Sequence, residues 1–232
     1  MPDELTPPKS TIGDDAHRMA KAVAGVVLPA GGDLIDAIVG PPLAKRVDAW
    51  RDTVAETIRE LLEHEQVTAE SLQDDPQFVD VVMCASRVSA YTSSSEKRDA
   101  LRNAILNTGL RSGPEHDERL IFIRLIDDLT EWHLRVLTLF NDPERWEQIS
   151  SAAGITLSGA NSLTDAAMRA FPELMSRAEF FDQIAKDLHG YGLLSIYGFE
   201  IALEEGEIPS SLTTNRGKGF LAFITRPGND FD

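Results

Sequence analysis

The sequence predicts a mainly α-helical protein, in which a helical bundle is followed by a small α+β unit. Apolar side chains recur every three or four residues through the first 150 positions, which is the spacing of one helical face. After Gly154 the pattern changes to short apolar runs separated by glycine and proline. The composition of 42% hydrophobic and 26% charged residues is typical of a folded globular chain.

Residues 1–15 are expected to form a flexible tail, because their prolines and acids leave little to bury. The apolar stretch 22–39 is about as long as a membrane-spanning helix, but two aspartates interrupt it, and carboxylates are costly inside a bilayer. We therefore expect a buried helical hairpin, in which a Pro-Ala-Gly-Gly turn joins Ala16–Leu28 to Asp33–Val39.

The strongest periodic signal predicts a helix over 42–65. Pro41 and Pro42 suit its start, where a missing N–H costs nothing. Its apolar positions, at spacings of 4, 3, 4, 4 and 3, are Leu43, Val47, Trp50, Val54, Ile58 and Leu61. These spacings place the six side chains on one face, which we expect to be in the core.

Cap residues divide the rest of the bundle. Asp75 before Pro76 predicts a helix start, Ser93 with Glu96 has the form of a capping box, and Thr130 is a candidate N-cap. Further helices are predicted to end near Tyr91, Gly109, Leu129, Phe140 and Ile149. A helical bundle with short loops is therefore expected over 16–150.

The second unit is expected over 151–232. One helix is predicted to run through Phe171, and a capping box at Ser176 predicts another that ends at Gly190. Two apolar runs are expected to be strands, although the second equally fits a short helix: 193–197 and 220–224.

This second unit resembles the winged-helix fold, in which a recognition helix leads through a glycine into a strand and a β-hairpin returns. The residues that carry the resemblance are Asp187, Leu188, Gly190, Gly192, Leu193 and Leu194, then Leu212, Thr213, Thr214, Gly217, Phe220 and Leu221. The resemblance implies a winged-helix-like domain over 151–232. It does not define a function, because such domains serve many roles.

The helical part also carries a resemblance. The runs EKRDALRNAILNTGL and RLIFIRLIDDLTEWHLRVLTLF look like bacterial helical proteins of unknown function, some of them linked to phage defence by abortive infection. The resemblance implies a bacterial-type protein with a defence or regulatory role. It brings no catalytic motif with it.

We expect no catalytic, cofactor-binding or metal-binding residues, and no cofactor. The five histidines lack the spacing of a helical zinc site, and Cys84 is expected to be a buried, inert thiol. The glycine-rich stretch Gly25–Asp33 lacks the Lys-Ser/Thr of a phosphate loop. An enzyme with an unrecognised site remains an alternative.

Seven basic residues are the candidate contacts to a partner or to nucleic acid: Arg87, Lys97, Arg98, Arg102, Lys186, Arg216 and Lys218. However, 38 acidic residues against 22 basic ones give the chain a net charge of -16, which disfavours binding to phosphates. The first four of these residues are expected to pair with acids of the same chain.

The sequence thus favours a cytoplasmic, non-enzymatic interaction or regulatory protein that acts through protein contacts or self-association. A single cysteine and an acidic, proline-rich start favour the cytoplasm. One alternative is a DNA-binding transcriptional regulator that uses the winged-helix-like domain. The other is a membrane-perturbing effector that uses residues 22–39, although membrane association is disfavoured.

Overall fold

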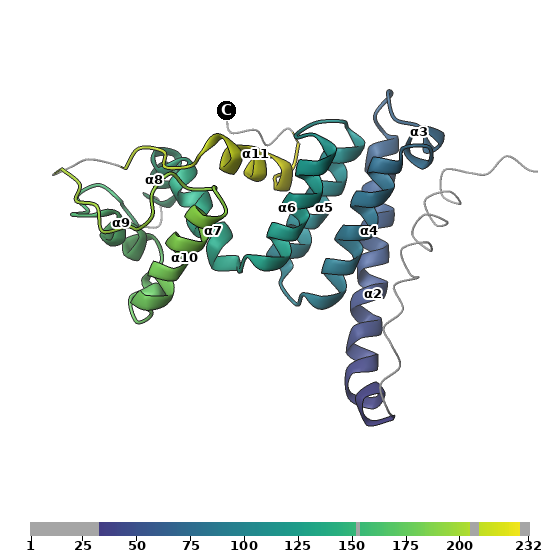
Figure 1. Ribbon diagram of the computed structural model, residues 1–232, viewed down its shortest axis with the longest axis horizontal. Helices are drawn as coiled ribbons and strands as arrows, with labels where there is room; N and C mark the ends of the chain where they lie inside the picture. Colours follow the sequence, from purple (N-terminus) through teal and green to yellow (C-terminus); the bar gives the residue numbers. More distant parts are fainter. Residues whose placement is uncertain (1–32, 152–153, 205–208, 228–232) are drawn as a thin grey trace, which may run out of the picture. The chain divides into compact units, whose positions relative to one another are not determined.

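The computed structural model describes residues 33–151, 154–204 and 209–227, and these are mainly helical (Figure 1). The chain forms two compact units. Unit 1 contains the residues up to Asp127 and those from Phe223 onward, and unit 2 contains Asp128–Ala222. The predicted boundary after residue 150 does not coincide with this division. The predicted tail and the first arm of the predicted hairpin lie outside the described residues.

Unit 1 is built on three helices that pack against one another, α2, α4 and α5. Its helices are α2 (Asp33–Leu62), α3 (Ala69–Gln73), α4 (Pro76–Tyr91), α5 (Ser95–Gly109) and α6 (His116–Asp128). The indole N–H of Trp50 donates to Ser86 Oγ at 2.9 Å, which joins α2 to α4. The N-cap role predicted for Asp75 is confirmed, because its carboxylate accepts hydrogen bonds from the first turn of α4.

Helix α2 differs from its prediction. The sequence placed a helix start at Pro41-Pro42, whereas α2 begins at Asp33 and continues through both prolines to Leu62. A proline inside a helix lacks the N–H that would donate to the carbonyl four residues earlier. Helix α2 nevertheless continues on both sides of Pro41-Pro42. The start at Asp33 agrees with the second arm of the predicted hairpin.

Two predicted capping boxes are wrong, and one predicted cap is confirmed. Helix α5 is capped by Ser94, one residue after Ser93, and the Ser94 hydroxyl accepts from the Lys97 N–H. Helix α10 (Ala178–Gly190) starts after Arg177 without a side-chain cap, so Ser176 is not its N-cap. Thr130 does precede its helix as predicted. Neighbouring serines offer equivalent caps, so local sequence does not choose between them.

Helix α5 ends at Gly109, as predicted, and a Schellman motif follows. The Arg111 N–H donates to the Thr108 carbonyl at 3.0 Å, and the Ser112 N–H donates to the Asn107 carbonyl at 2.9 Å. Arg111 has a φ of 55° and is the one non-glycine residue with positive φ in the described part of the chain. This backbone conformation costs an L-residue about 1 kcal/mol or more.

Unit 2 packs helices around a stack of three phenylalanines. Its elements are α7 (Glu131–Asn141), α8 (Pro143–Ser150), α9 (Leu163–Ala170), the 3-10 turn η3 (Pro172–Leu174), α10 (Ala178–Gly190) and most of α11 (Asn215–Ile224). Phe199, from the irregular chain after α10, stacks on Phe140 of α7 and on Phe181 of α10, with ring centroids 4.7 Å apart in both pairs.

The predicted strands do not form in the described residues. The run 193–197 contributes only an isolated bridge between Leu194 and Thr213, and 220–224 lies in helix α11, which was the stated alternative. The Thr214 hydroxyl accepts from the Gly217 N–H at 3.0 Å and thereby caps this helix. The described part of unit 2 is therefore helical with bridges, and a β unit of winged-helix type is not shown.

Candidate functional site

One face of α2 carries a continuous apolar row, of which only the C-terminal half is in the core. The core members are between 0% and 2% exposed and are Trp50, Val54, Ile58 and Leu61. The row continues toward the N-terminus at steps of four residues through Val47, Leu43 and Val39. Val39 is 50% exposed, and the other two are half-buried. We call these last three side chains the α2 apolar strip.

The N-terminal turns of α2 run beyond the ends of α4 and α5 (Figure 1), and the strip is partly exposed there. A side-chain carbon added at Gly40 would find no atom within 4 Å. With a rise of about 1.5 Å per residue, the strip from Val39 to Val47 is roughly 12 Å long. The strip is therefore about two helical turns of partly exposed apolar surface.

Sequence reasoning did not identify this strip. It assigned Leu43 and Val47 to a core face and placed Val39 in a separate helix, because Pro41-Pro42 was interpreted as a helix start. The steps of four residues from Val39 to Val47 continue across the prolines. That spacing was the signal for one continuous face.

The basic residues of unit 1 that the sequence singled out lie on α4 and α5. Arg102 pairs with Glu60 at 2.6 Å, and the Lys97 ammonium donates to the Asp127 carbonyl at 2.7 Å. Arg87 is exposed on α4 and Arg98 is half-buried on α5. For Arg102 and Lys97, the contacts are therefore within the chain.

The basic candidates of unit 2 lie on two helices. Lys186 on α10 pairs with Asp182 one turn earlier, at 2.5 Å, and this hydrogen bond raises the pKa of Lys186. Arg216 and Lys218 are exposed in the first turn of α11, where the positive end of the helix dipole adds to their charge.

His133 on α7 connects two helices of unit 2. Its Nδ1 accepts from the Thr130 N–H at 3.1 Å, and its Nε2 lies 3.2 Å from Asp187 Oδ2 on α10. The ring is 5% exposed, so His133 is packed in unit 2 and caps the start of α7. Cys84, expected to be buried, is half-buried on α4.

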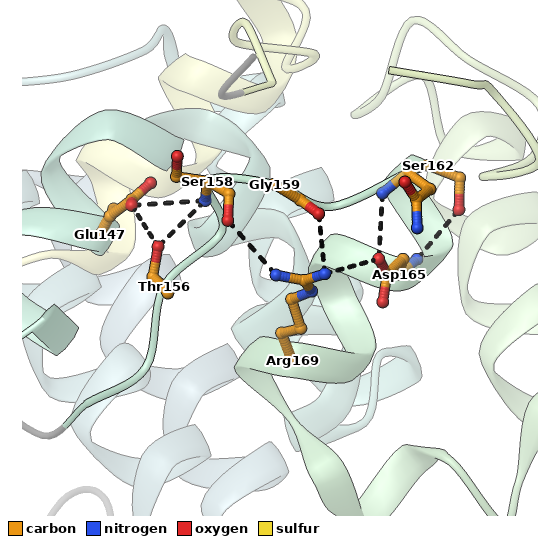
Figure 2. Close-up of polar contacts among 8 residues, drawn as sticks. Glu147, Thr156, Ser158, Gly159, Ser162, Asp165 and Arg169 are labelled. Carbon is orange, nitrogen blue, oxygen red and sulfur yellow. Dashed lines mark hydrogen bonds and ion pairs between the residues drawn. The ribbon is translucent and has the colours of Figure 1, made fainter. Parts of the chain in front are cut away.

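A network of hydrogen bonds and one ion pair holds the loop between α8 and α9 in place (Figure 2). The Arg169 guanidinium donates to the carbonyls of Ser158 and Gly159, at 3.3 and 2.8 Å, and to Asp165 at 3.1 Å. Glu147 accepts from the Thr156 hydroxyl at 2.6 Å. These contacts join α8, α9 and the loop between them, so the network is structural.

We expect Asp165→Asn to lower the stability of unit 2 at pH 7 by no more than about 1 kcal/mol, because the pair with Arg169 is partly exposed. The Asn161 N–H and then the Arg169 guanidinium hold the pKa of the Asp165 carboxyl below its usual value. A lowered folded-state pKa stabilises the fold above the unfolded pKa of about 4, and this stability is lost as the pH falls below that value through the folded-state pKa.

The difference between Asp165→Asn and the wild-type protein should therefore shrink from pH 6 to pH 3 in urea denaturation, on the order of the stability change expected at neutral pH. Glu200→Gln, at an exposed position, is the control and should show no such trend. An equal difference at both pH values would contradict the role given to Asp165.

The described residues hold no group of three His, Cys, Asp or Glu side chains placed to bind a metal ion. None of the described helices combines the length and hydropathy needed to cross a membrane. In comparisons with known proteins, no family model, no curated protein and no solved structure matches this chain.

Proposed function

We propose that this chain is a cytoplasmic, non-enzymatic interaction module of bacterial type, with a regulatory or defence role, and that it binds a protein through the α2 apolar strip. The observation that supports the proposal is the apolar row of α2, whose core half is buried and whose N-terminal half is partly exposed. Contiguous exposed apolar surface of this kind is typical of interaction sites.

An amphipathic helix is the partner that the strip suits best. Such a helix places apolar residues at steps of three and four against a row of the same spacing. Covering the three partly exposed side chains is worth on the order of 2–4 kcal/mol. This is less than a stable complex needs once the loss of translational and rotational freedom is included. The partner must therefore contact further residues of α2 as well.

Leu43→Asp is expected to release the partner, because it places a charge in the middle of the strip. Ala49→Asp adds the same charge at an exposed position on another side of α2 and is the matched control. The measurement is the native mass of the tagged full-length chain after pull-down from its own cell extract. Wild type and Ala49→Asp should carry a bound chain, and Leu43→Asp should lose at least nine-tenths of it, on the order of one factor of ten.

The proposal is wrong if Leu43→Asp keeps the bound chain, or if the wild-type protein is recovered at its own mass alone. The second result would mean that the strip is covered within the chain, for example by residues 16–28 as the predicted hairpin requires. Leu43 lies outside the core of unit 1, so thermal unfolding of Leu43→Asp should match that of wild type and exclude misfolding as the cause.

The alternative is a DNA-binding regulator of winged-helix type, and the exposed basic residues Arg216 and Lys218 at the start of α11 favour it. The net charge of -16 opposes it. Tight binding to duplex DNA that falls steeply with salt would favour the regulator over the interaction module. A membrane-perturbing effector would use residues 22–39, which lie mostly outside the described residues, and liposome flotation without recovered protein would exclude it.

A further inference from the structure

A cavity of about 500 Å³ lies in unit 1 beside the C-terminal end of α5, within the size range of small-molecule sites. It is lined by the chain that follows α2, by α3, by the N-cap of α4 and by the end of α5. The lining residues that carry charge or side-chain donors are His64, Glu65, Gln66, Ser71, Asp75 and Arg111. None of the three side chains of the α2 apolar strip lines the cavity, so a ligand bound here would be a second activity beyond the proposed function.

Arg111 is the unusual member of this lining. It occupies the left-handed position of the Schellman motif, with a φ of 55°, where glycine would fit without conformational cost. Residues held in such conformations cluster at functional sites. Among the described residues its guanidinium has no hydrogen-bond or ion-pair partner. A permanent positive charge with five donors is therefore available at the cavity.

The cavity also carries negative charge. The Asp75 carboxylate is already engaged, because it accepts from the N–H groups of Gln77 and Phe78 at 2.9 and 3.2 Å. Glu65 adds a second carboxylate to the lining. The C-terminal end of α5 adds the partial negative charge of a helix C-terminus. The lining of the cavity thus carries charges of both signs.

We propose that this cavity binds a small zwitterion of the α-amino-acid type, with its carboxylate on the Arg111 guanidinium and its ammonium group at Glu65. A phosphate ion meets Arg111 but is repelled by Glu65 and Asp75, and a simple cation is repelled by Arg111. The Gln66 amide and the His64 imidazole offer further hydrogen bonds. Val67 and Leu72, which also line the cavity, offer apolar contact to a ligand side chain.

The first test uses the full-length chain and the free standard amino acids at millimolar concentration, screened by thermal shift and then by calorimetry. At least one amino acid should bind. Its N-acetyl and carboxamide analogues, which each lack one charge, should bind at least about tenfold more weakly. Inorganic phosphate is the comparison ion. Binding of phosphate without binding of any amino acid, or no binding at all, would overturn the proposal.

The second test uses variants that keep the fold. Asparagine tolerates the left-handed conformation and is uncharged, so Arg111→Asn should unfold at the wild-type temperature or slightly above it and bind at least about tenfold more weakly. Glu65→Gln should weaken binding of the amino acid, but it should leave binding of the N-acetyl analogue unchanged. Arg87→Gln, at an exposed arginine on α4, removes the same charge as control. Wild-type affinity in Arg111→Asn would overturn the assignment.

Discussion

Replacing Phe199 with alanine is expected to destabilise unit 2 by about 3–5 kcal/mol, as for other buried phenylalanines. Its ring is 2% exposed and stacks between Phe140 of α7 and Phe181 of α10. Its carbonyl also accepts from the Thr164 N–H at 3.1 Å, at the start of α9. The alanine leaves a cavity between two helices, and neither of the remaining rings can fill it alone.

The measurement is urea denaturation, monitored by hydrogen exchange of peptides from α7 and α10. These peptides report on unit 2 alone. Tyr197→Ala is the control in the same irregular segment. Its ring is 64% exposed, so the variant should lose less than about 1 kcal/mol. Equal losses in Phe199→Ala and Tyr197→Ala would mean that the phenylalanine stack does not hold unit 2 together.

Gly217→Ala is expected to cost about 3 kcal/mol, the upper end of the range for overpacked sites. A Cβ at this position would lie 2.3 Å from the Leu193 carbonyl oxygen and 2.5 Å from a methyl carbon of Thr213. The Leu193 carbonyl is held in place, because it accepts from the Thr214 N–H at 3.0 Å. The clash is therefore with fixed backbone, and relief requires α11 to move.

Gly190→Ala is the matched control for Gly217→Ala in thermal and urea unfolding. A Cβ at Gly190 would meet no atom within 4 Å, and the residue closes α10. Alanine has the higher helix propensity, so this variant should be neutral or more stable by up to about 1 kcal/mol. A neutral Gly217→Ala would show that α11 does not pack closely on the chain at Leu193.

Much of the helical layout was predictable from the sequence, because its signals act over three or four residues. The periodic apolar face from Trp50 to Leu61 is buried as predicted. Asp75 and Thr130 precede their helices as predicted, and Gly109 and Gly190 end theirs. Periodicity and capping depend on the residue itself and on the next turn. They needed no knowledge of the rest of the chain.

The candidate sites depended on contacts between distant residues, which periodicity does not contain. The exposure of the α2 apolar strip depends on where α4 and α5 end. The cavity exists only because the end of α5 meets the chain that follows α2. Only the backbone geometry shows that the residue with positive φ after α5 is an arginine, Arg111. Among the candidate contacts that the sequence predicted in unit 1, Lys97 and Arg102 contact groups of the same chain instead.

By itself, the sequence determined that the chain is helical, where most helices end and which face of each is apolar. The tertiary structure decided the elements whose local signals were ambiguous. Pro41-Pro42 lies inside α2, the run 193–197 follows the packing of Phe199, and 220–224 is helical after the Thr214 cap. Short apolar runs fit a strand and a helix equally well, so long-range packing rather than local propensity selects between them.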